Sequence, residues 1–389
     1  LFVMSLLFYA YGEPKYVFLM LFMILFHYFL GLCIDKYHSK WILVFMVIAD
    51  ICILGYFKYL NFIVSIFTGN LNTFKIALPI GISFYTFQAI SYVVDVYRGT
   101  GKVQKNFLNV GLYISLFPQL IAGPIVRYET IEKEIENRKE TINDFCLGVT
   151  RFIIGLGKKV LLANKFAIVA DAVFAGVKSG STTNSFLFLW LGAISYTLQI
   201  FFDFAGYSDM AIGLGRMFGF HFMENFKYPY ISKSISEFWR RWHISLQTWF
   251  RDYIYIPLGG SRVNSKVRLV FNIFVVWLLT GIWHGANWTF IVWGLMYFVL
   301  LILEKFYHID QKMGKYKHLY TMFFVMMGWV LFRSDSIGSA LVYIRSMFGF
   351  GCKGFIDAMC IQYFKQNVLY YIMGILCCMP VFKNIVSVK

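Results

Sequence analysis

Long apolar runs separated by short polar segments dominate the chain. The clearest runs are Tyr16–Ile34, Trp41–Phe67, Ser185–Phe202, Val267–Ile282, Trp288–Leu303 and Val368–Ile385. Each approaches the roughly 20 residues that an α-helix needs to cross the hydrocarbon core of a bilayer. We therefore predict an all-α, polytopic membrane protein. The polar tip Asp35–Lys40 predicts that the first two runs form a helical hairpin.

Two further apolar stretches are interrupted by helix-breaking residues. Ile76–Val94 contains Pro79 and Gly81, and Phe107–Val126 contains Pro118. A broken helix at bilayer depth is tolerated only where protein or a water-filled cavity satisfies the freed backbone groups. We therefore expect kinked or re-entrant helices around a cavity.

A polar and aromatic segment, residues 224–265, separates two of the apolar runs. Within it, Glu237–Tyr255 has helical period and gathers its aromatic residues on one face. This pattern predicts an amphipathic helix that lies at the membrane interface. His243 falls at the edge of the aromatic face, and Arg240 and Gln247 continue the arc away from it. We treat residues 1–389 as one membrane domain with this interfacial segment inside it.

Composition agrees with a membrane protein. Only 14% of the residues are charged, against about 25% in soluble domains. The net charge of +16 fits lysines and arginines that flank spans and meet anionic lipid, so membrane lipid and not nucleic acid is the expected partner. The sequence contains no C-x-x-C, H-E-x-x-H, G-x-S-x-G or phosphate-loop motif, and we expect neither a metal nor a bound cofactor.

Two histidines carry the candidate chemistry. His284 lies in LLTGIWHGANWT, with apolar residues on both sides. An ionisable group at bilayer depth is costly and is by default a functional candidate, and imidazole transfers protons near neutral pH. His243 is separated from it by a single apolar run beyond the loop. One ring could accept a proton from a hydroxyl while the other orients the substrate or stabilises a carbonyl oxygen. A structural role remains open for both: an interhelical hydrogen bond for His284, and an interfacial position beside tryptophans for His243.

Asn287 lies one helical turn after His284, so the two side chains could share a face. Asn287 could equally cap the next helix. His27 lies alone in a uniformly apolar run, where packing is the expected role.

Other ionisable residues also border apolar stretches. Asp203 and Asp209 follow an apolar run, and we expect each to pair with a basic residue, with ion binding or proton relay as the alternative. For Arg151, Lys158 and Lys159 we expect side chains that extend to the interface.

Several segments together resemble the membrane-bound O-acyltransferase (MBOAT) family, specifically its bacterial alginate O-acetyltransferase type. The most specific stretches are EFWRRWHISLQTWFRDYIYIPLGG, at Glu237–Gly260, and TGIWHGANWTFIVW. The matching segments are Asp50–Asn61, Leu78–Arg98, Phe117–Arg127, Phe202–Gly215, Glu224–Gly260 and Thr280–Trp293.

The resemblance implies an MBOAT fold, with helices around a central funnel and one more span upstream of this sequence. It places the family's defining histidine at His284 and a second, less universal histidine at His243. It also implies an acyl thioester that approaches from the cytosol and a partner acetyltransferase outside the membrane.

We therefore expect a multi-pass O-acetyltransferase of the cell membrane. It would move acetyl from a cytosolic thioester such as acetyl-CoA towards an extracytoplasmic polysaccharide. His284 would act as the general base and His243 would orient or polarise the thioester. The side chains expected to bind substrate or support these two are Asn287, Trp283, Arg240 and Gln247.

Three alternatives stay open at this point. The donor could be a carrier-protein D-alanyl thioester, with teichoic acid as the acceptor. The chain could instead be an ion- or proton-coupled transporter that uses Asp203 and His284. It could also be a scaffold for an outer transferase, and would then tolerate loss of both histidines.

Overall fold

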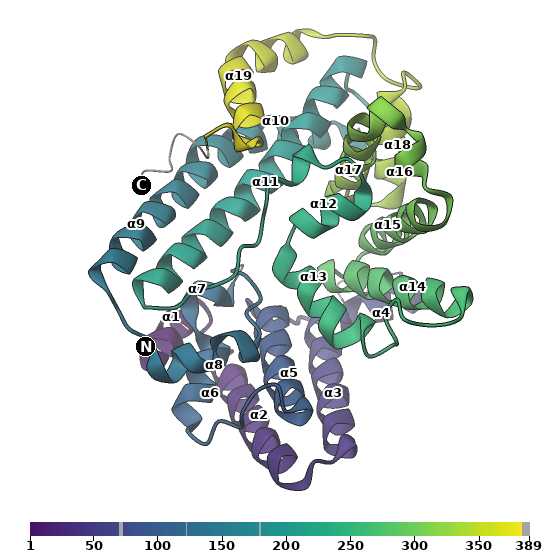
Figure 1. Cartoon of the computed structure of the whole chain (residues 1–389). Coiled ribbons are helices and arrows are strands. Elements are labelled where there is room, and N and C mark those ends of the chain that lie inside the picture. The colour runs from purple at the N-terminus through teal and green to yellow at the C-terminus, as the bar shows by residue number, and fades with distance from the viewer. Residues whose placement is uncertain (70–72, 122, 179, 383–389) are drawn as a thin grey trace. The chain divides into compact units, whose positions relative to one another are not determined.

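The structure is a computed structural model and describes residues 1–69, 73–121, 123–178 and 180–382. The regular secondary structure of the described residues is helical apart from one short hairpin of two strands, so the predicted all-α class is confirmed. Figure 1 shows how the helices follow one another along the chain. It divides into two compact units, the first comprising Leu1–Ile154 and Tyr207–Glu224, the second Gly155–Gly206 and Asn225–Lys389.

The first unit begins with helices that form the predicted hairpin. α2 ends at Tyr37 and α3 begins at Lys40. A π-helical turn, Gly55–Tyr59, joins α3 to α4. The helices are α1 (Phe2–Gly12), α2 (Val17–Tyr37), α3 (Lys40–Leu54), α4 (Leu60–Thr68), α5 (Ile82–Arg98), α6 (Phe107–Ser115), α7 (Phe117–Leu120), α8 (Tyr128–Asn137) and α9 (Ile142–Gly157), whose last three residues belong to the second unit.

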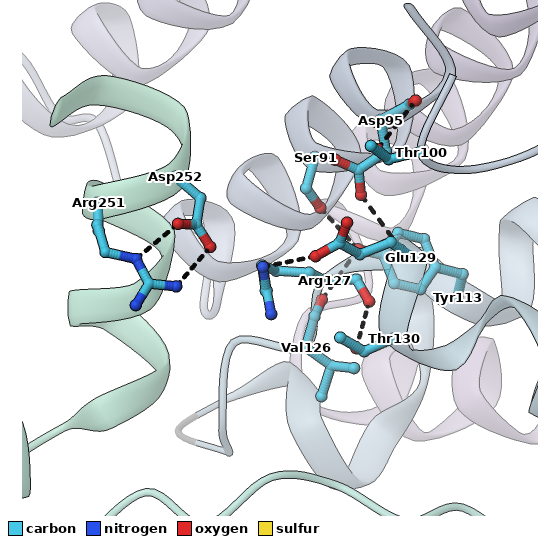
Figure 2. Close-up of polar contacts among 10 residues, drawn as sticks. All are labelled: Ser91, Asp95, Thr100, Tyr113, Val126, Arg127, Glu129, Thr130, Arg251 and Asp252. Carbon is cyan, nitrogen blue, oxygen red and sulfur yellow. Dashed lines mark hydrogen bonds and ion pairs between the residues drawn. The ribbon is translucent and has the colours of Figure 1, made fainter. Parts of the chain in front are cut away.

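Buried polar groups tie α5, α6 and α8 together in the first unit (Figure 2). The Tyr113 hydroxyl donates to the Val126 carbonyl at 2.9 Å and lies 2.8 Å from the Ser91 hydroxyl. An Asp95 carboxylate oxygen accepts from the backbone N–H of Glu129 in the first turn of α8, at 3.2 Å. These hydrogen bonds provide partners for polar groups that are buried away from water.

His27 was expected to pack alone, and the structure shows instead that it pairs with Asp50. His27 Nε2 lies 3.1 Å from Asp50 Oδ2, and His27 Nδ1 lies 2.8 Å from the Met23 carbonyl oxygen. Both side chains are fully buried, between α2 and α3. The sequence expectation missed the pair because Asp50 comes 23 positions later, in the next helix of the hairpin.

The second unit contains the remaining helices. A hairpin of β1 (Val177–Lys178) and β2 (Ser181–Thr182) precedes the long α11, whose last part belongs to the first unit. Its helices are α10 (Asn164–Ala175, after a π turn at Lys158–Ala163), α11 (Phe186–Met217), α12 (Ile235–Arg241), α13 (Ile244–Phe250), α14 (Lys266–His284), α15 (Trp288–Tyr307), α16 (Ile309–Lys312), α17 (Lys317–Arg333), α18 (Ile337–Met347) and α19 (Ala358–Cys377).

Five helices among the described residues are long and apolar enough to cross a membrane: α2, the continuous Lys40–Thr68, α11, α14 and α15. They correspond to five of the six predicted runs. The sixth, Val368–Ile385, differs because α19 begins ten residues earlier, behind the cap formed by Asp357, and ends at Cys377. Residues 383–385 of that run lie outside the described part.

The predicted single helix over Glu237–Tyr255 is broken in two. α12 ends at Arg241, α13 starts at Ile244, and His243 between them has a left-handed backbone with φ 47°. Asn225 causes the break, because its backbone carbonyl accepts from Ile244 N and its side chain accepts from Ser245 N. The aromatic face packs inside the protein, since Phe238, Trp239 and Trp242 are all at most 5% exposed.

Asp203 and Asp209 form the expected pairs with basic residues. In the second unit Lys159 Nζ lies 2.6 Å from Asp203 Oδ1, and in the first unit Arg151 Nη2 lies 2.7 Å from Asp209 Oδ1. Arg151 and Lys159 therefore form ion pairs with carboxylates. The sequence predicted that these side chains extend to the interface and did not include the ion pairs.

Small residues let α14 and α15 pack closely. A Cβ atom at Gly281 would lie 2.6 Å from the Phe290 carbonyl oxygen, and one at Gly294 would lie 2.5 Å from the Trp277 carbonyl oxygen. Close approach at small residues is a common way for membrane helices to associate. The two helices thus form a tight hairpin, with the connection Gly285–Asn287 at its tip and residues 266 and 307 at its base.

Candidate active site

His284 is the last residue of α14, at the tip of the α14–α15 hairpin, and is half-buried. Aromatic rings surround it. Its ring centroid lies 4.8 Å from that of Trp283, 4.9 Å from Trp293 and 5.1 Å from Phe332, all edge-on. These rings limit how the imidazole can turn, so α15 and α17 hold a titratable ring at one place.

His243 is the residue at the break between α12 and α13, and its exposed fraction is 1%. Positive φ is uncommon outside glycine and costs backbone energy. The segment around His243 tolerates this conformation because Asn225 binds both sides of it. Asn225 Oδ1 lies 3.1 Å from His243 Nδ1 and accepts from Ser245 N at 3.2 Å and from Ser245 Oγ at 2.9 Å.

These contacts determine which His243 nitrogen carries the proton. A backbone N–H can only donate, so the Asn225 atom bonded to Ser245 N must be the amide oxygen. The same oxygen faces His243 Nδ1, which therefore carries hydrogen. Burial lowers the pKa of His243 to about 3, so the ring is neutral near pH 7. Its buried Nε2 then holds a lone pair and has no hydrogen-bond partner within the described chain.

Trp283 connects the two histidines. Its ring centroid lies 4.8 Å from that of His284 and 6.1 Å from that of His243. Phe204 packs against His243 on another side, at 4.6 Å. The structure thus places three of the predicted site residues in one aromatic cluster of the second unit.

Asn287 forms the N-cap of α15. Its Oδ1 accepts from Thr289 N at 3.1 Å, and its Nδ2 donates to the Asp335 carbonyl at 3.0 Å. The residue therefore fixes the loop that follows His284 and ties it to the end of α17.

Arg240 and Gln247 lie elsewhere in the second unit, on the wall of a cavity of about 650 Å³ that we call the basic cavity. Arg251 and Lys305 also line it, as do the rings of Trp239 and Trp277. Neither His243 nor His284 lines this cavity, although Trp277 precedes His284 by seven residues on α14.

Some charged side chains on the wall of the basic cavity have hydrogen-bond or ion-pair partners, and others have none among the described residues. Glu304 accepts from the backbone of Ile235 and Ser236 at the start of α12, and Arg251 pairs with Asp252 at 2.7 Å. Among the described residues, Arg240 and Lys305 form no ion pair, and Asp310 is the unpaired carboxylate on the same wall. The cavity therefore offers two cationic side chains without ion pairs, Arg240 and Lys305, beside the carboxylates of Glu304 and Asp310.

Sequence reasoning missed Asn225. It precedes His243 by 18 positions and lies in an irregular segment, so no helical or strand period relates the two. The residue does fall inside Glu224–Gly260, one of the segments that carry the resemblance, but its role depends on the fold of the loop.

Comparisons with known proteins agree with this architecture. Residues 103–337 match the model of MBOAT, the membrane-bound O-acyltransferase family. The chain is 44% identical to "Probable alginate O-acetylase AlgI" of Pseudomonas syringae pv. tomato, over 90% of this chain and 70% of the relative. It is 37% identical to the peptidoglycan O-acetyltransferase of Helicobacter pylori, over 89% of this chain and 72% of the relative.

A more distant relative has another acyl group in its name. The teichoic acid D-alanyltransferase of Bacillus subtilis is 32% identical over 62% of each chain. The matched residues 103–337 include His243, His284 and Asn225. This chain, with its apolar spanning helices, belongs to the membrane-bound O-acyltransferase family and is an acyltransferase of a membrane.

Proposed function

We propose that the protein transfers acetyl from a cytosolic thioester, acetyl-CoA being the leading candidate, towards an extracytoplasmic polysaccharide. The pair of histidines around Trp283 carries this proposal, because it offers two imidazoles in one aromatic cluster. The names of the two most similar relatives reported above favour acetyl over D-alanyl. An extracytoplasmic acetyltransferase is the proposed partner, and the inner membrane of the cell is the proposed location.

In this mechanism His284 accepts the proton of the attacking hydroxyl. The hydroxyl oxygen attacks the carbonyl carbon of the thioester, and the C–S bond breaks. The sulfur takes the proton from His284 and leaves as the free thiol. General base catalysis of this kind contributes roughly 10²–10⁴-fold to the rate. His243 supplies a neutral Nε2 that accepts but does not donate a hydrogen bond. Its protonation state therefore favours orienting an N–H or O–H group of a substrate over polarising the carbonyl oxygen.

The basic cavity suits the anionic end of a thioester donor. Arg240 and Lys305 are available for phosphate groups, and Gln247 adds an amide. From Trp277 on the cavity wall to His284 is seven residues, or about 10 Å along a helix. A donor with its phosphates in the cavity would therefore need a long, thin arm to present its acyl group, as coenzyme A and a carrier-protein pantetheine both have.

The distribution of basic residues favours a cytosolic position for the base of the hairpin. Connections on the base side, residues 225–265 and 308–316, hold eight lysines and arginines. Connections on the tip side, residues 176–185, 285–287 and 334–357, hold three. Lysine and arginine are enriched in cytoplasmic connections, so we place the basic cavity near the cytosol and His284 towards the other face.

Thioester cleavage by the purified chain in lipid nanodiscs tests the proposal. Release of free thiol would be followed with acetyl-CoA, with an acetyl-loaded carrier protein and with a D-alanyl-loaded carrier protein. We expect cleavage of an acetyl thioester that requires His284. Preference for the D-alanyl carrier would transfer the proposal to that donor. Absence of cleavage, together with proton- or ion-coupled flux in liposomes, would contradict the proposed acyl transfer and support the transporter alternative.

A further inference from the structure

A second cavity lies at the opposite end of the α14–α15 hairpin from the basic cavity. It measures about 370 Å³, within the roughly 300–1,000 Å³ typical of ligand pockets. We call it the polar pocket. Residues at the end of α10, the end of α17 and the start of α18 line it, among them Asp171, Arg333, Ser334, Asp335 and Ser339.

The polar pocket adjoins the His284 loop through two contacts. Asn287, three residues after His284, donates to the backbone carbonyl of Asp335 at 3.0 Å. Phe332 packs edge-on against the His284 ring at 5.1 Å, and the next residue, Arg333, lines the pocket. The polar pocket is therefore linked to the His284 loop through Asn287 and through the neighbouring residues Phe332 and Arg333.

The wall of the polar pocket keeps hydrogen-bonding capacity for a ligand. Arg333 Nη2 pairs with Asp171 Oδ1 at 2.7 Å, yet both side chains stay partly exposed, at 37% and 57%. The carboxylate of Asp335 is exposed and forms no hydrogen bond or ion pair with another described residue. Carboxylate oxygens accept from hydroxyl groups, and the remaining guanidinium N–H groups donate to ring or hydroxyl oxygens.

The charge of the lining indicates what kind of ligand fits. Asp171 and Asp335 against Arg333 leave the wall with one net negative charge. Like charges repel, so a uronate or a phosphate is disfavoured at this place. A neutral ligand with several hydroxyl groups meets the acceptors and donors without that penalty.

We propose that the polar pocket binds a neutral, hydroxyl-rich saccharide segment of the acceptor, so that the polymer itself reaches this chain. The inference rests on the proposed acyl transfer for its biological meaning. Its binding test, however, needs neither donor nor partner. In this arrangement the thioester approaches His284 from the base of the hairpin, and the acceptor approaches from the tip.

Equilibrium binding of three probes to the intact chain in nanodiscs tests the pocket. The probes are a neutral β-linked gluco-oligosaccharide, the same oligosaccharide oxidised to uronate, and a serine-containing peptide. We expect the neutral saccharide to bind best. Asp335→Asn should weaken it about tenfold, the loss expected for one hydrogen bond to a charged group. The same variant should reduce the difference in affinity between the neutral and the uronate probes, because it removes the negative charge of Asp335.

Asp35→Asn is the matched control, since Asp35 is an exposed carboxylate in the last turn of α2, in the other unit. Arg333→Lys keeps the positive charge but loses the planar fork of donors, and should also weaken the neutral saccharide. Each variant should elute from size-exclusion chromatography in detergent as the wild type does, which reports that it folds.

Three outcomes would overturn the inference: equal binding by wild type and Asp335→Asn, tighter binding of the uronate, or tighter binding of the peptide. Failure of the wild type to cleave any thioester would defeat the proposed function instead. The two failures are therefore distinguishable.

Discussion

Two buried histidines, one in each compact unit, are held in opposite ways. In the first unit both ring nitrogens of His27 have partners, the Met23 carbonyl and the Asp50 carboxylate. In the second unit only Nδ1 of His243 has one, Asn225, and the buried Nε2 has none within the described chain. Both side chains are at most 1% exposed. Burial therefore does not distinguish the two histidines, whereas the unpaired Nε2 of His243 does.

The difference also has an energetic meaning. A carbonyl oxygen only accepts, so His27 Nδ1 donates to the Met23 carbonyl, and Nε2 faces the Asp50 carboxylate at 3.1 Å. Such a buried pair specifies how two helices meet, and removal of one partner leaves the other uncompensated. An unpaired buried nitrogen such as His243 Nε2 costs desolvation energy, and no hydrogen bond within the chain offsets that cost. Its retention is easier to understand if a substrate group supplies the missing partner.

The largest expected effect comes from removing the proposed base. His284→Ala should reduce acyl transfer by about 100-fold or more, because general base catalysis contributes roughly 10²–10⁴-fold. The amount of protein in the membrane should stay the same. Thiol release by purified wild type and variant measures the loss. His38→Ala, at an exposed position after α2, serves as the control, and unchanged transfer by His284→Ala would remove this residue from the mechanism.

Breaking the His27–Asp50 pair should affect stability and leave the chemistry intact. Asp50→Leu should lower the free energy of unfolding by about 3–5 kcal/mol, since it leaves a buried imidazole without its carboxylate. The double variant His27→Leu/Asp50→Leu should recover much of this loss, because two apolar groups can pack in place of the pair. Thermal unfolding in detergent measures both. Activity per folded molecule that falls in step with His284→Ala would contradict a structural role for His27.

Asn225 should act as a positioning residue for His243. Asn225→Ala removes the acceptor that holds the Nδ1 proton, and acyl transfer should fall roughly tenfold, the upper range for one neutral hydrogen bond. Asn272→Ala is a matched control, because Asn272 is a fully buried asparagine in the same unit that donates to the Gly260 carbonyl. It should cost stability without changing the pH dependence of the reaction. Equal effects of the two variants on activity and pH profile would reduce Asn225 to a structural group.

Burial of His243 should also make the stability of the protein depend on pH. His243 is held neutral, with its pKa lowered to about 3 by burial, against about 6.5 in the unfolded chain. Between these values the unfolded state binds more protons, so His243 makes stability fall as pH decreases from about 6.5 towards 3. His243→Gln should lose less stability over this window than wild type. Chemical unfolding at several pH values measures the difference, and parallel curves would contradict the buried, neutral ring.

Much of the second unit was predictable because its apolar runs are continuous. Val267–Ile282 and Trp288–Leu303 lie within α14 and α15, which extend beyond these runs by at most four residues. The break at His243 was not predictable, since the period of Glu237–Tyr255 runs through it without interruption. Only the hydrogen bonds from Asn225, which no period relates to His243, overcome that helical preference.

By itself the sequence determined which segments are apolar enough to span a membrane and which ionisable side chains they carry, because burial in lipid depends on local composition. Tertiary structure decided which of those side chains are satisfied. Asp50 reaches His27 across a helical hairpin, and Asn225 reaches His243 across a loop. Hydrogen bonds act over about 3 Å in space, whatever the separation along the chain, and for that reason the chemistry of these rings emerges only when the chain is folded.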